Sequence, residues 1–494
     1  MARWKVAFTL ERRGDVPLFQ QIARTIAADI QRGRLRPGDA LPGTRTLAHD
    51  LGVQRLTAVA AFDELVAEGW IVNRPARGAF VSDDVPDPLP RRFSSREVPA
   101  VMADRTGYDL LPAPEPEKPY DVPRGSLLFA PTRPDVRLAP ATAIGRALRR
   151  AMGKRSGELL AYGPSQGHPR LRQAVSGMLA STRGIAAATE NVCITRGSQM
   201  ALSLLARVLL RPGDAVAVEQ LGYRPAWEAF RLAGARIVGV PVDGEGMQVQ
   251  TLERAIVDHK IRAVYVTPHH QFPTTVTLSA GRRLQLLDLA RAHRFAVIED
   301  DYDHEFHFDG RPVLPLASID RFGVVAYVGT FSKVLAPACR LGYVAAPVPV
   351  IERIAAHRSL LDIQGDQVLE YAIAELLEEG EIQRHIRRVR REYRLRRDTL
   401  VEALSGSLSG WMTFDVPAGG IALWVRVDER LDVDQWASAA SERGAIVITG
   451  KSYALDRRPQ PFTRLGFASL NTAELREGVR RLAAARPRAA RRPT

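Results

Sequence analysis

A proline-rich stretch divides this chain of 494 residues into two parts that must fold separately. Residues 83–124 contain nine prolines, many of them in runs such as DVPDPLP and LPAPEPEKPYDVPRG. Proline blocks helices and central strands alike, and at this density it favours an extended, semi-rigid spacer. We therefore predict a linker at 83–124 between a small domain, residues 1–82, and a large one, residues 125–485. The last residues, 486–494, are predicted to form a basic tail.

Charge and cysteine content restrict the partners and the compartment. The formal net charge of +14 favours a polyanionic partner, most simply nucleic acid. The two cysteines, Cys193 and Cys339, lie far apart without metal-ligand spacing, which argues against a disulfide framework and a zinc site. The N-terminus lacks a continuous apolar run, and no segment approaches the ~18 apolar residues of a membrane span. We expect a cytoplasmic protein without a membrane partner.

The small domain has the pattern of a winged helix-turn-helix. PLFQQIARTIAADIQRG, TRTLAHDLG and VQRLTAVAAFDELVAEG predict three helices, and WIVNRPARGAFVS predicts a two-stranded wing. Thr44 is expected to cap the second helix, and Gly52 is expected to end it. The alternative is a small helical domain with solvated arginines and no nucleic-acid partner.

Five residues of this domain are candidates for contact with double-stranded DNA. Gln54, Arg55 and Thr57 stand at the start of the third helix, where side chains reach base edges in the major groove. Arg45, in the first turn of the second helix, can hold a phosphate or a base. Arg77, at the tip of the wing, can enter the adjacent minor groove.

The large domain alternates short β-branched runs with amphipathic stretches. The runs include AVAVE (215–219), AVYVT (263–267), FAVIED (295–300) and VVAYVG (324–329), and each precedes a turn or a helical pattern. Such alternation is typical of βαβ units. We predict an α/β fold with a mostly parallel sheet.

Four residues at strand ends have the chemistry that pyridoxal 5'-phosphate requires. Lys333, which follows VVAYVG, is placed to form an imine with an aldehyde. Asp300, at the end of FAVIED, would keep a pyridine nitrogen protonated by direct charge pairing. Tyr302 could hydrogen-bond the phenolic oxygen of the cofactor, and Tyr223 could stack on its ring.

An anion cradle is predicted for the phosphate of this cofactor. TRGSQMALSLLARVLL places a glycine turn before a helix, so main-chain amides at the helix N-terminus would face the phosphate. Two hydroxyls just before the lysine and one arginine after it would complete the cradle. The residues are Gly197, Ser198, Gln199, Thr330, Ser332 and Arg340.

Two family resemblances rest on these motifs. The stretch LPGTRTLAHDLGVQRLTAVAAFDELVAEGWI, with the later RGAFV, resembles the DNA-binding domain of the GntR family. ITRGSQMAL, VTPHHQFPTT, VIEDDYDHEF, GTFSKVLAPACRLGYV and FTRLGFA resemble fold-type I aminotransferases of subclass I. The whole chain resembles the MocR/GabR-type regulators, in which a winged domain acts on transcription and the aminotransferase-like domain senses a small amino compound or pyridoxal phosphate.

The resemblance also implies roles for individual residues. It makes Lys333 the lysine of the internal aldimine, and Arg464 the arginine that binds the carboxylate of an amino-acid effector. It makes Tyr162 the tyrosine that reaches the phosphate of the neighbouring subunit, so a homodimer is expected. Phe272 stands where catalytic aminotransferases carry an asparagine, so weak or no turnover is expected. Thr275 stands where a glycine is usual, and its bulk is expected to narrow or reshape the effector site.

Several alternatives remain open at this point. A working aminotransferase with a DNA-binding module would use the same residues, whereas a dead dimerisation scaffold is disfavoured by the set Lys333, Asp300 and Arg340. RHIRRVRREYRLRR (384–397) is expected to be a solvated helix face, with a second DNA contact as the alternative. The pair at 269–270, two histidines, is expected to make loop hydrogen bonds, and no metal site is predicted.

Overall fold

The chain divides into two compact units, Met1–Leu111 and Pro112–Thr494. The computed structural model describes residues 10–12, 16–75, 77–85, 105–110, 122–130, 132–310 and 313–486. Most of the predicted linker and all of the predicted tail after residue 486 lie outside the described residues. No helix of the described ranges is long and apolar enough to cross a bilayer.

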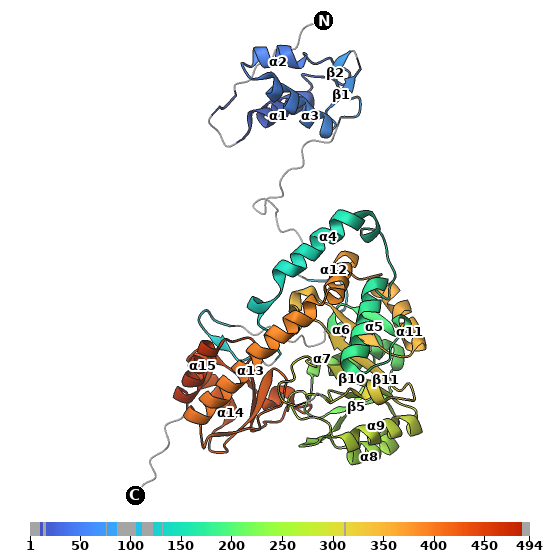
Figure 1. Ribbon diagram of the computed structural model, residues 1–494, viewed down its shortest axis with the longest axis vertical. Helices are drawn as coiled ribbons and strands as arrows, with labels where there is room; N and C mark the ends of the chain where they lie inside the picture. The colour runs from blue at the N-terminus through green and yellow to red at the C-terminus, as the bar shows by residue number, and fades with distance from the viewer. Residues whose placement is uncertain are drawn as a thin grey trace. The chain divides into compact units, whose positions relative to one another are not determined.

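The N-terminal unit consists of three helices and a hairpin (Figure 1). Side chains such as Ile26, Leu47, Phe62 and Trp70 form its core. The second helix begins at Thr44 with Gly43 as its N-cap, so the predicted Thr44 cap is wrong. The elements are α1 (Leu18–Gln31), α2 (Thr44–Asp50), α3 (Arg55–Ala67) and the antiparallel pair β1 (Ile71–Arg74) and β2 (Gly78–Val81).

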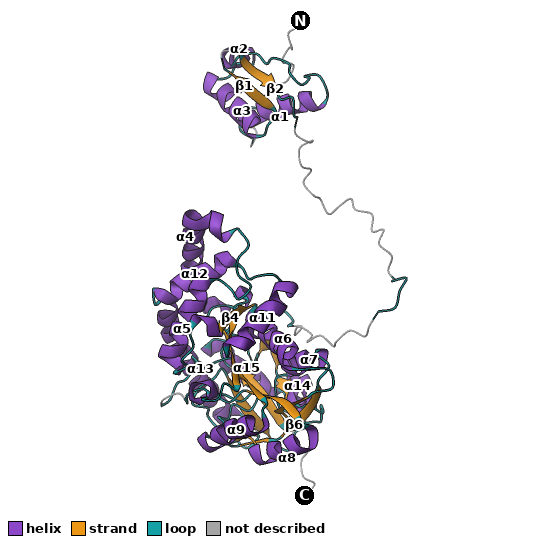
Figure 2. Ribbon diagram, turned by 90° about the vertical axis from the view of Figure 1, so that its right-hand side faces the viewer, coloured by secondary structure: helices purple, strands orange, loops and turns teal. Residues whose placement is uncertain are grey.

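A seven-stranded sheet forms the centre of the C-terminal unit (Figure 2). Neighbouring strands of the sheet are parallel except at β12, which is antiparallel to both β11 and β4. The predicted α/β fold with a mostly parallel sheet is therefore confirmed. In spatial order the strands are β4 (Val192–Thr195), β12 (Gly342–Ala345), β11 (Val325–Thr330), β10 (Ala296–Asp301), β9 (Ile261–Val266), β5 (Ala215–Glu219) and β6 (Arg236–Val240).

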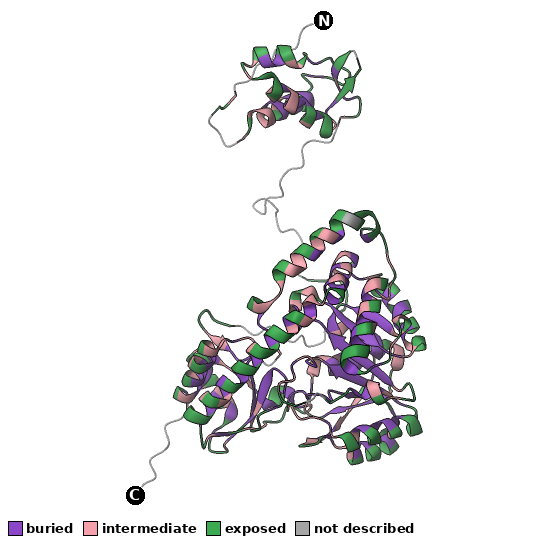
Figure 3. Cartoon of the chain, in the orientation of Figure 1, coloured by how far each residue is buried: buried purple, intermediate pink, exposed green. Residues whose placement is uncertain are grey.

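Helices cover both faces of this sheet, and the strands are buried between them (Figure 3). Alternate residues of one strand face opposite layers: Ile298 packs with α6, α7 and α11, and Val297 packs with α8 and α9. The first layer is α6 (Gly197–Leu209), α7 (Arg224–Leu232) and α11 (Val348–Leu361). The second layer is α5 (Pro169–Arg183), α8 (Val249–His259), α9 (Ala280–His293), α10 (Leu316–Ile319) and α12 (Gln367–Glu378).

The C-terminal part of the unit is built around a smaller, four-stranded sheet. It packs with long helix α13 (Glu381–Ser407), α14 (Val433–Glu442) and α15 (Thr472–Ala484) around residues such as Leu423 and Trp436. Its order is β13 (Met412–Thr413), β14 (Ala422–Val427), β17 (Phe462–Gly466) and β16 (Ile448–Thr449). The remaining elements are α4 (Ala141–Leu159), β3 (Leu127–Leu128) paired with β15 (Ala445–Ile446), and β7 (Val242–Asp243) paired with β8 (Gly246–Met247).

The arginine run predicted as a solvated face lies on α13. Six of its eight arginines are exposed, and the last two are buried. Arg396 pairs with Asp135 over 3.0 Å, and Arg397 pairs with Asp309. Most of the run is therefore a solvated face, whereas its end holds the helix against the rest of the unit.

Candidate functional site

The predicted site residues gather at the carboxyl end of the large sheet. Asp300 is the penultimate residue of β10, and Lys333 follows β11 by three residues. Gly197 begins α6 directly after β4, and Tyr223 is the N-cap residue of α7, shortly after β5. The carboxyl ends of parallel strands meet at one edge, where α/β proteins bind their ligands.

Asp300 is a buried carboxyl group with one oxygen engaged and one oxygen unpaired. Its Oδ2 accepts a hydrogen bond of 2.8 Å from the hydroxyl of Tyr265, whereas Oδ1 has no partner among the described residues. Burial raises the pKa of Asp300 to about 7, against the opposing effect of the Tyr265 hydrogen bond. A cationic N–H donor at Oδ1 would satisfy the free oxygen and stabilise the ionised form.

Lys333 is half-buried and makes no hydrogen bond or ion pair within the described part of the chain. Burial lowers the pKa of Lys333 to about 8, although the charges of Asp300 and Asp303 act in the opposite direction. About a tenth of the amine is therefore neutral at pH 7, far more than for a lysine with the ordinary pKa near 10.4, and a nucleophilic lysine requires the neutral form.

The N-terminus of α6 lies beside the guanidinium of Arg340, so two sources of positive potential meet there. Gly197 has φ +76°, and a Cβ at this residue would lie 3.1 Å from Nη2 of Arg340. The same Nη2 donates to the carbonyl oxygen of Arg196 at 2.9 Å, which holds the guanidinium over the first turn of the helix. A side chain at position 197 would therefore crowd this guanidinium, and the positive φ of the residue also favours glycine.

The other predicted cradle residues border the same region. The hydroxyl of Thr330 accepts a hydrogen bond of 3.1 Å from the main-chain amide of Ser332, and both residues are buried. Ser198 lies in the first turn of α6. Gln199 donates from Nε2 to the carbonyl of Pro225 and so ties α6 to α7, while its Oε1 has no partner in the described ranges.

Arg464, on β17, is a fully buried guanidinium without a carboxylate partner among the described residues. Its Nη2 donates to the hydroxyl oxygen of Tyr302 over 3.2 Å, whereas Nε and Nη1 have no partner. Its Cζ lies 4.4 Å from the centre of the Phe272 ring. A buried, unpaired cation with two free donors is suited to a carboxylate ligand.

Aromatic rings line this part of the site. Phe272 makes edge contacts with Tyr223 at 5.6 Å and with Tyr453 at 5.4 Å between ring centres. Tyr302 donates from its hydroxyl to the carbonyl oxygen of His270 at 3.0 Å. Tyr265 and Tyr453 were not among the predicted site residues; the signal for Tyr265 was a hydroxyl between two valines of the run AVYVT.

Tyr162 does not join these residues within one chain. It lies shortly after α4, is 85% exposed, and makes no hydrogen bond with the residues that the structure describes. The side chain is thus available for contact with another molecule.

The predicted DNA-contacting residues lie on the surface of the N-terminal unit. Gln54 and Arg55 are the N-cap and the first residue of α3, and both are exposed. Thr57 is half-buried in the same turn, and Leu56 beside it is 76% exposed. Arg45 in the first turn of α2 is also exposed.

The wing carries a further free cation. Arg77, in the turn between β1 and β2, is exposed, and its guanidinium has no acidic partner in the described ranges. The same is true of Arg45 and Arg55. Three arginines without carboxylate partners can all contact phosphate or base edges.

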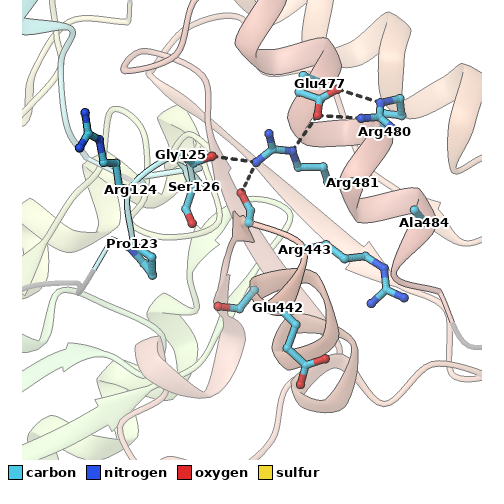
Figure 4. A pocket seen from close by; sticks show the side chains of 12 residues that line it. Pro123, Arg124, Gly125, Ser126, Glu442, Arg443, Glu477, Arg480, Arg481 and Ala484 are labelled. Carbon is cyan, nitrogen blue, oxygen red and sulfur yellow. Dashed lines mark hydrogen bonds and ion pairs between the residues drawn. The ribbon is translucent and has the colours of Figure 1, made fainter.

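A pocket of about 630 Å³ lies elsewhere in the C-terminal unit (Figure 4). Arg481 at this pocket donates to the carbonyl oxygens of Gly125 and Gly444 and to Glu477, which also accepts from Arg480. These arginines are already engaged, and no predicted site residue lines the pocket. We therefore do not assign the candidate site to it.

Two family models match the chain. The model for aminotransferase class I and II matches residues 135–482, and the model for bacterial regulatory proteins of the gntR family matches residues 18–81. The fold of the first family implies dependence on pyridoxal phosphate.

Relatives and solved structures agree with these matches. The protein named “Probable rhizopine catabolism regulatory protein MocR” from Rhizobium meliloti is 32% identical, over 96% of this chain and 95% of its own length. The HTH-type transcriptional regulator TauR of Rhodobacter capsulatus is 32% identical, over 97% of this chain and 98% of its own. The multiple substrate aminotransferase of Thermococcus profundus is 30% identical, with a TM-score of 0.69, over 73% of this chain and 91% of its own.

Proposed function

The chain belongs to the aminotransferase class I and II family and, within it, to the MocR-type transcriptional regulators with a gntR-family DNA-binding domain, and from this premise we propose how it detects its signal. The C-terminal unit binds pyridoxal 5'-phosphate at Lys333 and Asp300. A small amino compound, or the cofactor itself, then changes how the N-terminal unit acts on operator DNA.

The observation that carries this proposal is the pair of Lys333 and Asp300. Burial favours the neutral amine of Lys333, and Asp300 keeps one buried oxygen without a partner. Pyridoxal phosphate supplies, when bound, an aldehyde that exchanges amines and a pyridine nitrogen that takes up a proton. Lys333 provides the amine, and Asp300 holds the proton on the ring nitrogen by charge pairing.

The phosphate would be held at the N-terminus of α6. The amides of Gly197 and Ser198, in the first turn of α6, would donate to an anion there, and Arg340 would add a fixed positive charge. The hydroxyls of Thr330 and Ser332 supply further donors. The main-chain amide of Gln199 would also face the phosphate, Tyr223 would stack on the ring, and Tyr302 would hydrogen-bond its phenolic oxygen.

Arg464 is proposed to bind the carboxylate of an amino-acid effector. A bidentate pair would use Nη2 together with Nε or Nη1, which have no partner among the described residues, and Nη2 at present makes a single hydrogen bond of 3.2 Å to Tyr302. A carboxylate at this guanidinium would compete with the Tyr302 contact. The effector therefore interacts differently with two arrangements of the site, which a shift between conformations requires.

The N-terminal unit is proposed to bind DNA by its second and third helices and its wing. Gln54, Arg55 and Thr57 would read base edges, and Arg45 and Arg77 would contact the backbone or the minor groove. A homodimer would place two such units on two half-sites. The exposure of Tyr162 supports a dimer in which this side chain reaches the phosphate of the other subunit.

Aminotransferase turnover is a second candidate function. The presence of Lys333, Asp300 and Arg464 together favours it, because these residues supply the amine, the charge partner and the carboxylate anchor. Phe272 opposes it, because a phenyl ring offers no hydrogen bond to the cofactor oxygen. The measurement that separates a catalyst from a sensor is the amount of product formed from an amino acid and a keto acid. A catalyst forms many product molecules per chain, whereas a sensor does not.

One experiment tests the proposed function directly. Full-length protein is used to select sites from a random duplex library, and binding to the enriched site is measured with and without pyridoxal phosphate and a panel of amino compounds. We expect a preferred site whose affinity changes with ligand in the wild type, whereas the Lys333→Ala protein binds the site without responding. Equal binding of all duplexes, or an unchanged response in Lys333→Ala, would refute the proposal.

A further inference from the structure

Four histidine rings meet beside the candidate site, on two loops that follow adjacent strands. His269 and His270 follow β9, and His304 and His307 follow β10. The ring centre of His269 lies 4.3 Å from that of His270, 4.8 Å from that of His304 and 6.1 Å from that of His307. A cluster of this size brings several lone pairs into one small volume.

Most of the nitrogens that face one another there have no partner. Both ring nitrogens of His269, which is 4% exposed, lack a hydrogen bond among the described residues. Both ring nitrogens of half-buried His307 lack one as well. A buried polar atom without a partner costs free energy, so a cluster of them calls for an additional ligand.

His270 has the orientation of a metal-binding histidine. Its Nδ1 lies 2.8 Å from Oδ1 of the buried Asp303, so the carboxylate holds the proton on Nδ1 and leaves a lone pair on Nε2. On the Nε2 side, a Cβ at Gly419 would lie only 2.7 Å away. A larger residue at 419 would fill the space beside this nitrogen.

We propose that His269, His270 and His307 bind one divalent transition-metal ion, of which Zn²⁺ is the probe. One nitrogen from each ring lies within 4.8 Å of the others. Zinc–nitrogen bonds of about 2.0–2.1 Å in a tetrahedron place nitrogens about 3.4 Å apart. Small rotations of the rings would bring the nitrogens from separations of up to 4.8 Å to the separation that a zinc site requires. His304 does not take part, because its Nδ1 faces Oδ2 of Asp301 at 2.9 Å.

The donor set selects the class of metal. Three neutral imidazoles suit Zn²⁺, Ni²⁺, Cu²⁺ and Co²⁺ rather than Mg²⁺ or Ca²⁺, which prefer oxygen ligands. His307 also lines a cavity of about 450 Å³ that opens to solvent and carries Arg387, Arg390 and Arg391. The cavity gives solvent access to His307, and its positive charge opposes the approach of any divalent cation, so the imidazole ligands alone must provide the affinity.

The metal site is linked to the candidate effector site by main-chain geometry. The carbonyl oxygen of His270 accepts the hydrogen bond from Tyr302, and the Tyr302 hydroxyl in turn accepts from Arg464. Coordination by His270 would fix the loop that carries this carbonyl. The inference does not depend on the proposed cofactor, and metal binding is measured with and without added pyridoxal phosphate.

The test is a Zn²⁺ titration of the untagged full-length chain against a chromophoric chelator, after removal of metal with EDTA. We expect one Zn²⁺ per wild-type chain. The double variant His269→Gln/His307→Gln should lose this site, and Asp303→Asn should weaken it by about 10–100-fold with the three ligands intact. His259→Gln, an exposed histidine of α8, is the matched control and should bind as the wild type does.

Other results would overturn the proposal. A wild-type chain that takes up no Zn²⁺, Ni²⁺, Cu²⁺ or Co²⁺ below millimolar concentration has no such site, whatever the variants do. Equal affinity in the wild type and the double variant would place the bound metal elsewhere. Because the wild-type measurement alone decides the first point, the test stands even if a variant folds poorly.

Discussion

The hydroxyl of Tyr265 donates a hydrogen bond of 2.8 Å to Oδ2 of Asp300 and leaves the other carboxylate oxygen free. The two residues lie on adjacent strands, β9 and β10, and point to the same face of the sheet. The tyrosine fixes the carboxyl group so that Oδ1 remains for a ligand. Without that ligand, the single hydrogen bond from Tyr265 does not offset the free-energy cost of burying the ionised carboxylate of Asp300.

Asp300→Asn should therefore stabilise the cofactor-free chain more at pH 8 than at pH 5. The folded-state pKa of Asp300 is raised to about 7, so its contribution to stability is full below pH ~4 and is lost as the pH rises through 7. At pH 8 the substitution should recover on the order of 2–4 kcal/mol, because Asn can still accept from Tyr265. Calorimetry measures this effect in the thermal unfolding transition of the C-terminal unit, which is recognised by its shift when pyridoxal phosphate is added.

The same variant should bind pyridoxal phosphate more weakly, since the neutral amide cannot pair with a pyridinium. Higher stability with lower cofactor affinity is the expected combination. A variant that is less stable at pH 8 than at pH 5, relative to the wild type, would show that Asp300 is held ionised by other groups.

Attachment of the cofactor to Lys333 should depend on pH with a midpoint near 8. Burial lowers the pKa of Lys333 to about 8, and only the neutral amine is nucleophilic. The rate at which visible absorption appears after mixing should rise about tenfold per pH unit below 8 and level off above it, whereas an ordinary lysine near 10.4 would show no plateau. In Lys333→Ala, borohydride should attach no cofactor covalently to the chain, because no imine with that lysine is there to be reduced. Lys451→Ala should behave as the wild type.

How far the sequence predicts the site depends on the kind of residue. Asp300 and Lys333 follow apolar runs, and strand ends can be located from such runs, so their meeting at one sheet edge was predictable. Gly197 was predictable for the same reason. Tyr265 was missed because a tyrosine within a buried strand is most simply a core residue, and only the register of β9 and β10 brings its hydroxyl to Asp300.

Loop conformation accounts for the rest. The rings of His269 and His307 belong to segments that are far apart in sequence, and no periodic pattern predicts that they face each other. The stacking of Arg464 over Phe272 likewise depends on a loop path. Thr44 had the residue type of a cap, but the chain enters α2 one residue earlier, at Gly43.

Mixing two defective chains should restore cofactor binding if the dimer shares its sites. Lys333→Ala removes the amine, and Tyr162→Ala should weaken phosphate binding by about tenfold, the worth of one hydrogen bond to a charged group. A heterodimer of the two variants has one site with both residues and one with neither. Absorbance titration of the refolded mixture with pyridoxal phosphate should therefore reveal tight binding that is absent from either homodimer. A titration curve equal to the average of the curves of the two homodimers would refute shared sites.

Two arginines of the N-terminal unit should affect DNA binding in different ways. Arg55→Ala, at the start of α3, should reduce discrimination between bases at one position of each half-site by about 1–3 kcal/mol. Arg45→Ala should weaken binding to all duplexes alike and lower the dependence of affinity on salt. Fluorescence anisotropy with the selected site and single-base variants, at several salt concentrations, separates these outcomes; Arg32→Ala, exposed after α1, is the control.

Leu56 adds an apolar contact to this surface. It is 76% exposed beside Arg55, where a methyl-bearing side chain can meet the methyl group of thymine. Leu56→Ala should reduce the preference for thymine over uracil at one position of the selected site by about 1 kcal/mol or less. Equal affinity of the wild type for the thymine and uracil duplexes would exclude this contact.

Arg464→Met should separate effector recognition from the other properties of the chain. The guanidinium is fully buried, and two of its donors lack partners in the described residues, so methionine of similar length removes an uncompensated charge. The cofactor-free variant should melt at the same temperature as the wild type or higher. Visible absorption and binding to the selected DNA site should remain.

The response to a carboxylate effector should nevertheless be lost. A bidentate pair with a charged partner contributes about 1.5–3 kcal/mol, so the variant should need roughly 10- to 100-fold more effector to change DNA affinity. An amine effector without a carboxylate should act equally on both proteins, and this comparison shows whether the loss is specific. Arg426→Met, an exposed position on β14, is the matched control. A normal carboxylate response in Arg464→Met would mean that another group binds the carboxylate and that the buried charge of Arg464 serves only the contact with Tyr302.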